Sequence, residues 1–152
     1  MENEPIRTEV DGITFLSTGH YYEGINQWVA HKLKEGDIGC YNFAAKQMAK
    51  MLPKNAVLVP IPGRHGKADQ TLHLCRDIAS YTCLPVVDAL RGKDRESQYE
   101  AKYKGHSLTE EQLGFHKVVG SVVHFVGHDQ SRTGGNYEGR QDHDCHQDLD
   151  QG

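Results

Sequence analysis

Two stretches between residues 26 and 52 carry apolar side chains at the spacing of an α-helix. The first stretch stops before a glycine and the second before a proline, which cannot continue a helix. This pattern predicts two consecutive helices whose apolar faces point toward a core. The side chains expected on those faces are Trp28, Val29 and Leu33 in the first helix and Phe43, Ala44, Met48 and Leu52 in the second. Upstream, the short apolar run within residues 12–24 predicts a strand or hairpin.

The period changes at residues 56–62, which are almost wholly apolar. Such a short run is typical of a strand that is buried on both faces. A polar break at residues 63–67 follows, and then a third helical pattern that ends before another apolar run at residues 85–87. A strand, loop, helix and strand in about thirty residues are typical of a βαβ unit. We therefore expect an α/β fold with a parallel sheet flanked by helices, similar to a Rossmann fold.

Residues 91–105 are strongly charged and almost free of aliphatic side chains, which is typical of a surface loop. Residues 108–113 predict a short helix, for which Ser107 and Glu110 form a candidate capping box. The apolar residues in 115–126 then predict a strand or a strand pair interrupted by a glycine.

The composition changes abruptly after residue 126, because residues 127–152 contain only one aliphatic side chain, Leu149. Such a stretch cannot supply the covering helix and further strand that a parallel sheet needs. We therefore divide the chain into an α/β domain, residues 1–126, that is incomplete at its C-terminal end, and a polar tail, residues 127–152. The tail is expected to be disordered over most of its length.

Charge and hydropathy argue against nucleic-acid-binding and membrane-spanning classes of protein. The chain of 152 residues has a formal net charge of −4, so it lacks the strongly basic surface that nucleic-acid binding needs. It has no apolar run long enough for a membrane span, and its first residues lack the features of a signal segment. We expect a cytoplasmic protein with no membrane or nucleic-acid partner.

The break after the first buried strand is a candidate anion-binding loop. Backbone N–H groups at the start of a helix attract anions, and Gly63 and Gly66 allow close approach of the backbone. Arg64 and Lys67 add two positive charges. Residue types alone leave two interpretations open, a phosphate-binding loop and an ordinary basic turn. The spacing does not fit a Walker loop.

The order of segments resembles that of the type I phosphoribosyltransferases, most closely the competence-type (ComF or amidophosphoribosyltransferase-like) branch. The resemblance rests on the runs VLVPIPGRHGKADQTLHLCRDIA and LPVVDALRGKDRESQYEAKYKG and covers roughly residues 50–135. In that branch a V-P-[VI]-P strand end leads into a basic loop and a helix. The resemblance implies a phosphoribosyltransferase-like fold that binds phosphoribosyl pyrophosphate.

The family transfers ribose 5-phosphate from phosphoribosyl pyrophosphate to a nitrogen nucleophile in nucleotide metabolism, with Mg²⁺ bridging pyrophosphate and ribose oxygens. By position, the loop at residues 62–68 matches the family's pyrophosphate loop, with Arg64 and Lys67 facing the leaving group. Residues 91–104 match its mobile loop. The cations that the resemblance places there are Arg95, Lys102 and Lys104.

The family's ribose-phosphate motif is expected directly after the strand that ends near residue 126. It normally has two adjacent acids followed by a T-G-x-T turn. In this chain Asp129 is the one acid, and it is therefore the candidate catalytic residue and Mg²⁺ ligand. Thr133, Gly134 and Gly135 keep the character of the phosphate turn, whereas Asn136 replaces its final threonine.

Three alternatives follow from this departure. Codons for residues 127–130, read one nucleotide later, permit Asp-Met-Ile, and those for residues 135–140 permit Gly-Thr-Met-Arg-Ala-Ala. We therefore hypothesise that part of the tail is a frameshift product, which a resequenced gene with an unchanged reading frame would disprove. The second alternative is an active transferase whose acceptor is a nitrogenous base or an amine. The third is an inactive domain that binds phosphorylated ligands or a protein. An open sheet edge would also favour a homodimer.

Overall fold

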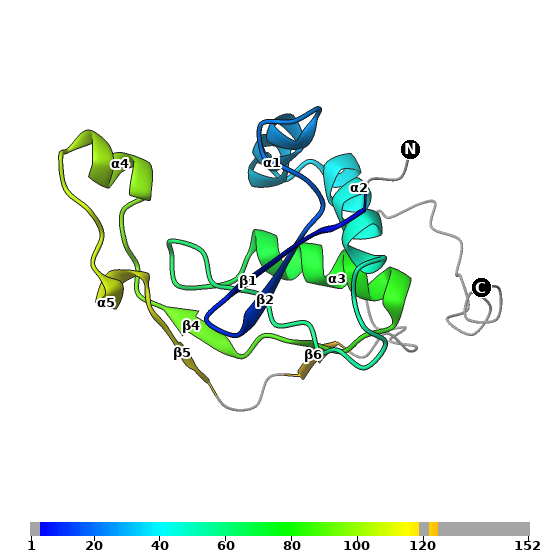
Figure 1. Ribbon diagram of the computed structural model, residues 1–152. Helices are drawn as coiled ribbons and strands as arrows, with labels where there is room; N and C mark the ends of the chain where they lie inside the picture. Colours follow the sequence, from blue (N-terminus) through cyan, green and yellow to red (C-terminus); the bar gives the residue numbers. More distant parts are fainter. Residues whose placement is uncertain (1–3, 119–121, 125–152) are drawn as a thin grey trace, which may run out of the picture.

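The computed structural model describes residues 4–118 and 122–124 and is a mixed α/β structure (Figure 1). The elements in its N-terminal half are β1 (Ile6–Val10), β2 (Ile13–Ser17), α1 (Asn26–Glu35) and α2 (Ile38–Ala49). They are followed by α3 (Gln70–Thr82), β3 (Val86–Val87), β4 (Leu90–Gly92), α4 (Gln98–Tyr103), α5 (Glu110–Leu113), β5 (Phe115–Lys117) and β6 (Val122–His124). None of the helices in the described ranges is long and apolar enough to cross a membrane.

The core lies where α2 and α3 pack against each other and against the strand region below them (Figure 1). It is a cluster of small and medium apolar side chains: Ala45, Leu58, Ile78, Ala79, Leu84 and Val86. Ala45, Ala79 and Val86 are fully buried, and the two alanines allow close approach of the helices. The two helices expected between residues 26 and 52 and the helix after the loop are thus confirmed.

Of the predicted βαβ unit, the structure shows the helix, β3 and a single parallel contact between β3 and the segment before the loop. Leu58 and Val86 form an isolated parallel bridge, in which the Leu58 N–H donates to Pro85 O (2.9 Å) and the Val87 N–H donates to Leu58 O (2.9 Å). The ladder does not extend beyond it, because Pro60 and Pro62 have no N–H to donate.

The continuous parallel sheet that we expected is not formed by the described residues. They form three two-stranded antiparallel pairs, β1 with β2, β3 with β6, and β4 with β5. The register between β3 and β6 also shifts between Val86 and Val87, which shortens that pair further. The segment expected as a strand or strand pair at residues 115–126 is found as β5 and β6, which pair with different partners rather than with each other.

The apolar run at residues 56–62 is buried on one face only, which corrects the expectation of two buried faces. Leu58 is 7% exposed and Pro60 below 2%, whereas Val57 (54%), Val59 (42%) and Ile61 (55%) face solvent. The buried face packs against the α2–α3 layer, and no equivalent layer of described helices covers the other.

Two further details differ from the sequence pattern. Trp28, expected in the core, is 56% exposed, and its neighbour Val29 is the buried residue of α1. The capping box at the start of α5 is formed by Thr109 and Gln112, two residues later than the expected pair. In both cases the structure differs from the sequence pattern by one or two positions. The reason is that tertiary contacts decide which of several neighbouring residues is buried or begins the helix.

The N-terminal hairpin is confirmed but begins earlier than expected, at Ile6. Asp11 (φ 51°) and Gly12 (φ 75°) form its two-residue turn, in which both positions need a positive φ. Val10, Ile13, Phe15 and Leu16 remain 39% to 60% exposed and Ile6 is half-buried, so the hairpin adds little to the core.

One-sided burial can be tested with two matched isoleucine truncations. We expect Ile78→Ala to lower the free energy of unfolding by about 2–5 kcal/mol, because it leaves a cavity in the core. Ile61→Ala should change it by no more than about 0.5 kcal/mol, because the removed atoms are largely in solvent. Urea unfolding followed by circular dichroism measures both. An equally large effect of Ile61→Ala would show that this face is covered in solution.

Candidate functional site

The loop at residues 62–68 lies between the Leu58 bridge and α3, where the sequence placed the anion-binding site. It is closed on itself by two hydrogen bonds, from the Gly63 N–H to Lys67 O (2.9 Å) and from the Gly66 N–H to Gly63 O (3.0 Å). Two of the backbone donors expected to face a phosphate are therefore used inside the loop. In this conformation the loop offers an anion mainly the side chains of Arg64, His65 and Lys67.

Gly66 is the position where the loop requires a glycine. Its φ is +76°, which disfavours other residues, and a Cβ there would overlap with Gly92 O. The Gly92 N–H donates to Gly66 O (3.0 Å), so the end of β4 lies directly against the loop. The glycine therefore serves close packing of two chain segments in addition to the turn.

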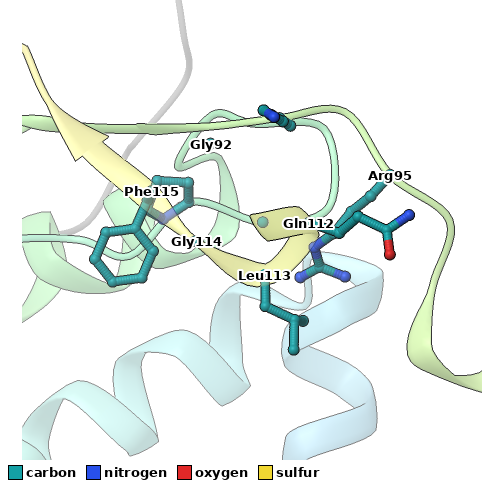
Figure 2. A pocket seen from close by; sticks show the side chains of 9 residues that line it. Gly92, Arg95, Gln112, Leu113, Gly114 and Phe115 are labelled. Atoms are coloured by element: carbon teal, nitrogen blue, oxygen red, sulfur yellow. The ribbon is translucent and has the colours of Figure 1, made fainter. Parts of the chain in front are cut away.

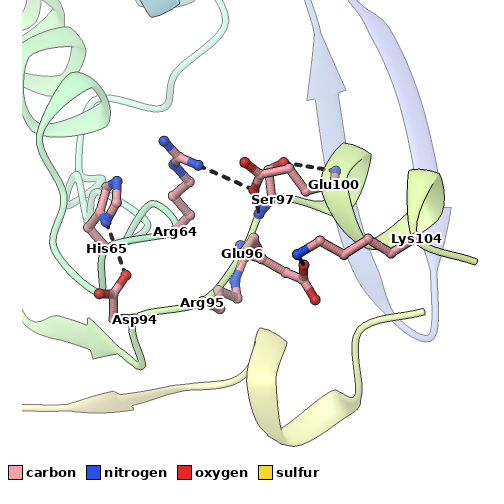
Figure 3. Close-up of polar contacts among 8 residues, drawn as sticks. All are labelled: Arg64, His65, Asp94, Arg95, Glu96, Ser97, Glu100 and Lys104. Carbon is pink, nitrogen blue, oxygen red and sulfur yellow. Dashed lines mark hydrogen bonds and ion pairs between the residues drawn. The ribbon is translucent and has the colours of Figure 1, made fainter. Parts of the chain in front are cut away.

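The charged segment after β4 continues along the same loop (Figure 3). The Arg95 N–H donates to Arg64 O (2.9 Å), next to an antiparallel bridge between His65 and Asp94. The side chains of that bridge also meet, with His65 Nδ1 3.0 Å from Asp94 Oδ1. The predicted pyrophosphate loop and the predicted mobile loop are thus in direct contact.

Part of the segment expected as a surface loop is a helix, α4. Ser97 and Glu100 form a complete capping box, in which the Ser97 N–H donates to Glu100 Oε2 (2.8 Å) and the Glu100 N–H to Ser97 Oγ (3.0 Å). The S-x-x-E spacing was present in the sequence and was overlooked. Hydrogen bonds from Ser97, with a smaller contribution from Arg64, hold the pKa of Glu100 below its usual 4.5.

Glu100 also pairs with the loop, since Arg64 Nη1 lies 3.5 Å from Glu100 Oε2 (Figure 3). Nearby, Glu96 accepts hydrogen bonds from Lys104 Nζ (2.8 Å) and from His106 Nε2. Lys104 first and then His106 keep the pKa of Glu96 below 4.5. Arg64 and Lys104 of this cluster were predicted from the sequence, whereas its three acids, Asp94, Glu96 and Glu100, were not.

A small hollow lies beside the loop, between it and the α5–β5 region (Figure 2). Its volume is about 10 Å³, which is room for about one water molecule. It is lined by Pro62, Gly63, Gly92, Lys93, Arg95, Gln112, Leu113, Gly114 and Phe115. In this conformation the hollow is too small for a pyrophosphate group.

The structure brings together most of the predicted pyrophosphate-binding residues. Gly63, Arg64, Gly66 and Lys67 form the loop, and Arg95 lies beside it in the segment that pairs with it. Lys102 lies on α4, exposed, and makes no side-chain ion pair or hydrogen bond with the described residues.

The predictions for the ribose-phosphate half fall outside the described residues. They concern Asp129, the candidate catalytic residue and Mg²⁺ ligand, and the turn at Thr133, Gly134 and Gly135.

The acids near the loop do not make a magnesium site by themselves. Mg²⁺ prefers several oxygen ligands in octahedral geometry, and no group of three candidate ligands occurs among the described residues. Asp94, Glu96 and Glu100 are each paired with a cationic side chain or a histidine. The described residues therefore do not fit a protein-held magnesium ion.

Comparison of the sequence with protein families and curated proteins, and of the fold with solved structures, finds no match. A functional proposal for this chain therefore rests on its own residues and on the motif resemblance described above.

The contact between the loop and β4 predicts that Gly66→Ala lowers the free energy of unfolding more than an alanine at another glycine with a positive φ does. Gly105 (φ +82°) is the matched control, because a Cβ there meets nothing within 4 Å. We expect Gly105→Ala to lower the free energy of unfolding by about 1–2 kcal/mol, because alanine is less stable than glycine in this backbone conformation. Gly66→Ala should cost more, and it should shift the amide signals of Gly92 and Arg95 in NMR spectra. Equal costs and unchanged signals would contradict the close approach.

The carboxyl groups near α4 predict a pH dependence of its contacts. Because the pKa of Glu96 is lowered in the folded protein, its pairing stabilises the fold above pH 4.5 and this contribution is lost as pH falls through the folded-state value. NMR titration of the Glu96 carboxyl should give a pKa below 4.5. Lys104→Met should raise that pKa, whereas Lys102→Met, two residues earlier in α4, should not. A Glu96 pKa unaffected by Lys104→Met would refute the pairing.

Proposed function

We propose that this chain is a phosphoribosyltransferase-like protein that binds phosphoribosyl pyrophosphate through the loop at residues 62–68. The observation that carries the proposal is the place of this basic loop. It connects the segment that is bridged to β3 at Leu58 with the start of α3, and it lies against a charged segment that carries Arg95. A parallel βαβ unit with a basic loop of this kind is the arrangement that the motif resemblance predicted.

The finer fold is part of the same proposal. We infer that the Leu58–Val86 bridge belongs to a parallel, Rossmann-like sheet of the phosphoribosyltransferase type. Two backbone hydrogen bonds of parallel geometry and the packing of α2 and α3 on one face support this assignment. The exposed face formed by Val57, Val59 and Ile61 is where such a sheet would carry its second layer.

In the proposed reaction the bond between the ribose C1 and the pyrophosphate oxygen breaks, and a bond forms between C1 and the nitrogen of a base or amine. The nitrogen loses a proton, and pyrophosphate leaves with the electron pair of the broken bond. Arg64 and Lys67 stabilise the negative charge that develops on the leaving group. Arg95 lies in the segment beside them. Lys102 is a further cation that movement of α4 could bring to the site.

Magnesium would enter this site with the ligand. The described residues do not hold it, and the pyrophosphate oxygens of phosphoribosyl pyrophosphate provide the hard oxygen ligands that Mg²⁺ prefers. Asp129 is the protein ligand that the resemblance implies. The roles of Arg64 and Lys67 in binding do not depend on that assignment.

A second candidate function is that of an inactive domain that binds phosphorylated ligands or a partner protein. The sequence Gly127-His128-Asp129 favours it, because the family motif has two adjacent acids at this place. A binding domain would keep the basic loop and lose the residues that hold the ribose. An association of two copies, suggested by the exposed apolar strand face, is compatible with both functions.

Calorimetric titration of the full chain with phosphoribosyl pyrophosphate, with and without magnesium, tests the proposal. We expect binding that Arg64→Ala and Lys67→Ala each weaken about fivefold or more, since each removes a charge from the loop. Lys34→Ala, which removes a charge from α1, is the matched control and should bind as the wild type does. No heat and no thermal shift at millimolar ligand would disprove the proposed function for this chain.

The two candidate functions differ in their response to a restored acidic pair. If the chain is a transferase with a damaged motif, the double substitution Gly127→Asp and His128→Asp should produce pyrophosphate release from phosphoribosyl pyrophosphate. If it is a binding domain, the double variant should bind the ligand and release no pyrophosphate. A coupled assay for pyrophosphate measures this directly.

A further inference from the structure

The basic side chains of the loop at residues 62–68 face carboxylates of the same chain. Arg64 pairs with Glu100 (3.5 Å) and His65 with Asp94 (3.0 Å). Both acids come from residues 92–100, the segment that follows β4, and Figure 3 shows each of them turned toward its partner on the loop. Of the loop's charged side chains, Lys67 alone has no ion pair with the described residues.

Two acids of the following segment, Asp94 and Glu100, face the loop, and its Arg95 lines the hollow beside the loop. Lys104 and His106 are both bound to Glu96, and Arg91 is bound to Asp88 (2.7 Å). These cations are therefore engaged with other carboxylates. Asp94 and Glu100 instead contact side chains of the basic loop, in the place that a bound anion would occupy.

Backbone contacts hold the same segment in position. The Gly92 and Arg95 N–H groups donate to Gly66 O and Arg64 O, one on each side of the His65–Asp94 bridge. With the segment in this place, the neighbouring hollow has room for about one water molecule. The hollow therefore has no room for a pyrophosphate group while the segment is in this place.

We propose that residues 92–100 form an acidic cover that inhibits anion binding at the loop. Glu100 occupies the Arg64 guanidinium and Asp94 the His65 imidazole, and a pyrophosphate-bearing ligand binds by displacing these carboxylates. This inference rests on the proposed function and adds a regulation to the same site. The ligand replaces two carboxylates at the loop, so its net binding is weaker than the loop cations alone would give.

The cover can leave the loop without unfolding α4. Glu100 Oε2 accepts from both Arg64 and the Ser97 N–H, so the capping box persists when the Arg64 contact breaks. The pairs to be broken are solvent-exposed, with side-chain exposures of 49% for both Arg64 and Glu100, and such pairs are weak. Gly105, with φ +82° and open space around it, lies just after α4 and can serve as a hinge.

The experiment is a titration of the full chain with inorganic pyrophosphate, using variants that remove only the charge of the cover. Glu100→Gln keeps a carboxamide oxygen for the Ser97 N–H and so preserves the capping box. We expect Glu100→Gln and Asp94→Asn each to tighten pyrophosphate binding about two- to fivefold, and the double variant about tenfold. Glu35→Gln, which removes a carboxylate paired with Lys32 on α1, is the control for net charge and should have no effect.

Two outcomes would overturn the proposal that residues 92–100 inhibit anion binding. If the two cover variants bind pyrophosphate no more tightly than the wild type while Arg64→Ala binds more weakly, the loop binds anions without competition from the acids. If neither the wild type nor any variant binds, the anion site is absent and the proposed function fails as well. The two failures are therefore distinguishable.

Hydrogen exchange of the Arg95 amide, followed at constant pH, gives an independent measure of whether the cover lies on the loop. This amide donates to Arg64 O only while the cover is in place. We expect pyrophosphate to accelerate its exchange relative to the Tyr41 amide in α2, and Glu100→Gln to accelerate it without ligand. Slower exchange with pyrophosphate would mean that the segment closes over the ligand, and it would overturn the displacement.

Discussion

The parallel contact between Leu58 and Val86 is the constraint on which the rest of the structure depends. It joins two segments separated by a loop and a 13-residue helix, α3, and it places both on the buried side of the α2–α3 layer. The bridge is short, so burial of Leu58, Ile78 and Val86 contributes more to holding it than its hydrogen bonds do. Because the strand is held there, the loop that follows emerges next to the start of α3.

The position of the loop determines which charges meet. The chain leaves β3, turns into β4 and passes the loop at Gly66, where the absence of a Cβ permits contact. From that contact onward the charged segment lies along the loop and pairs with it through Asp94 and Glu100. A segment that its composition marks as solvated is therefore structured by the loop it faces, and its charges act within the candidate site.

The same arrangement leaves an apolar face in solvent. Val57, Val59 and Ile61 alternate with buried neighbours, as they would in a sheet covered on one side only. The hairpin β1–β2 has its own exposed apolar side chains and does not cover this face. Strand pairing in the described residues stops at two strands, since Pro60 and Pro62 supply no donors and β3 has an irregular register with β6.

The sequence by itself determined the elements whose signals are local: the helices α1, α2 and α3, the hairpin and the basic loop between a strand and a helix. It also located Gly63, Arg64, Gly66 and Lys67 in that loop. Only the tertiary structure decided the face of α1 that is buried, the one-sided burial at Leu58 and the pairing of Arg64 with Glu100. These features depend on contacts between segments that are distant in the sequence; Arg64 and Glu100, for example, are 36 residues apart. Periodicity in a single sequence reports which side chains share a face, and it does not report which surface that face will meet.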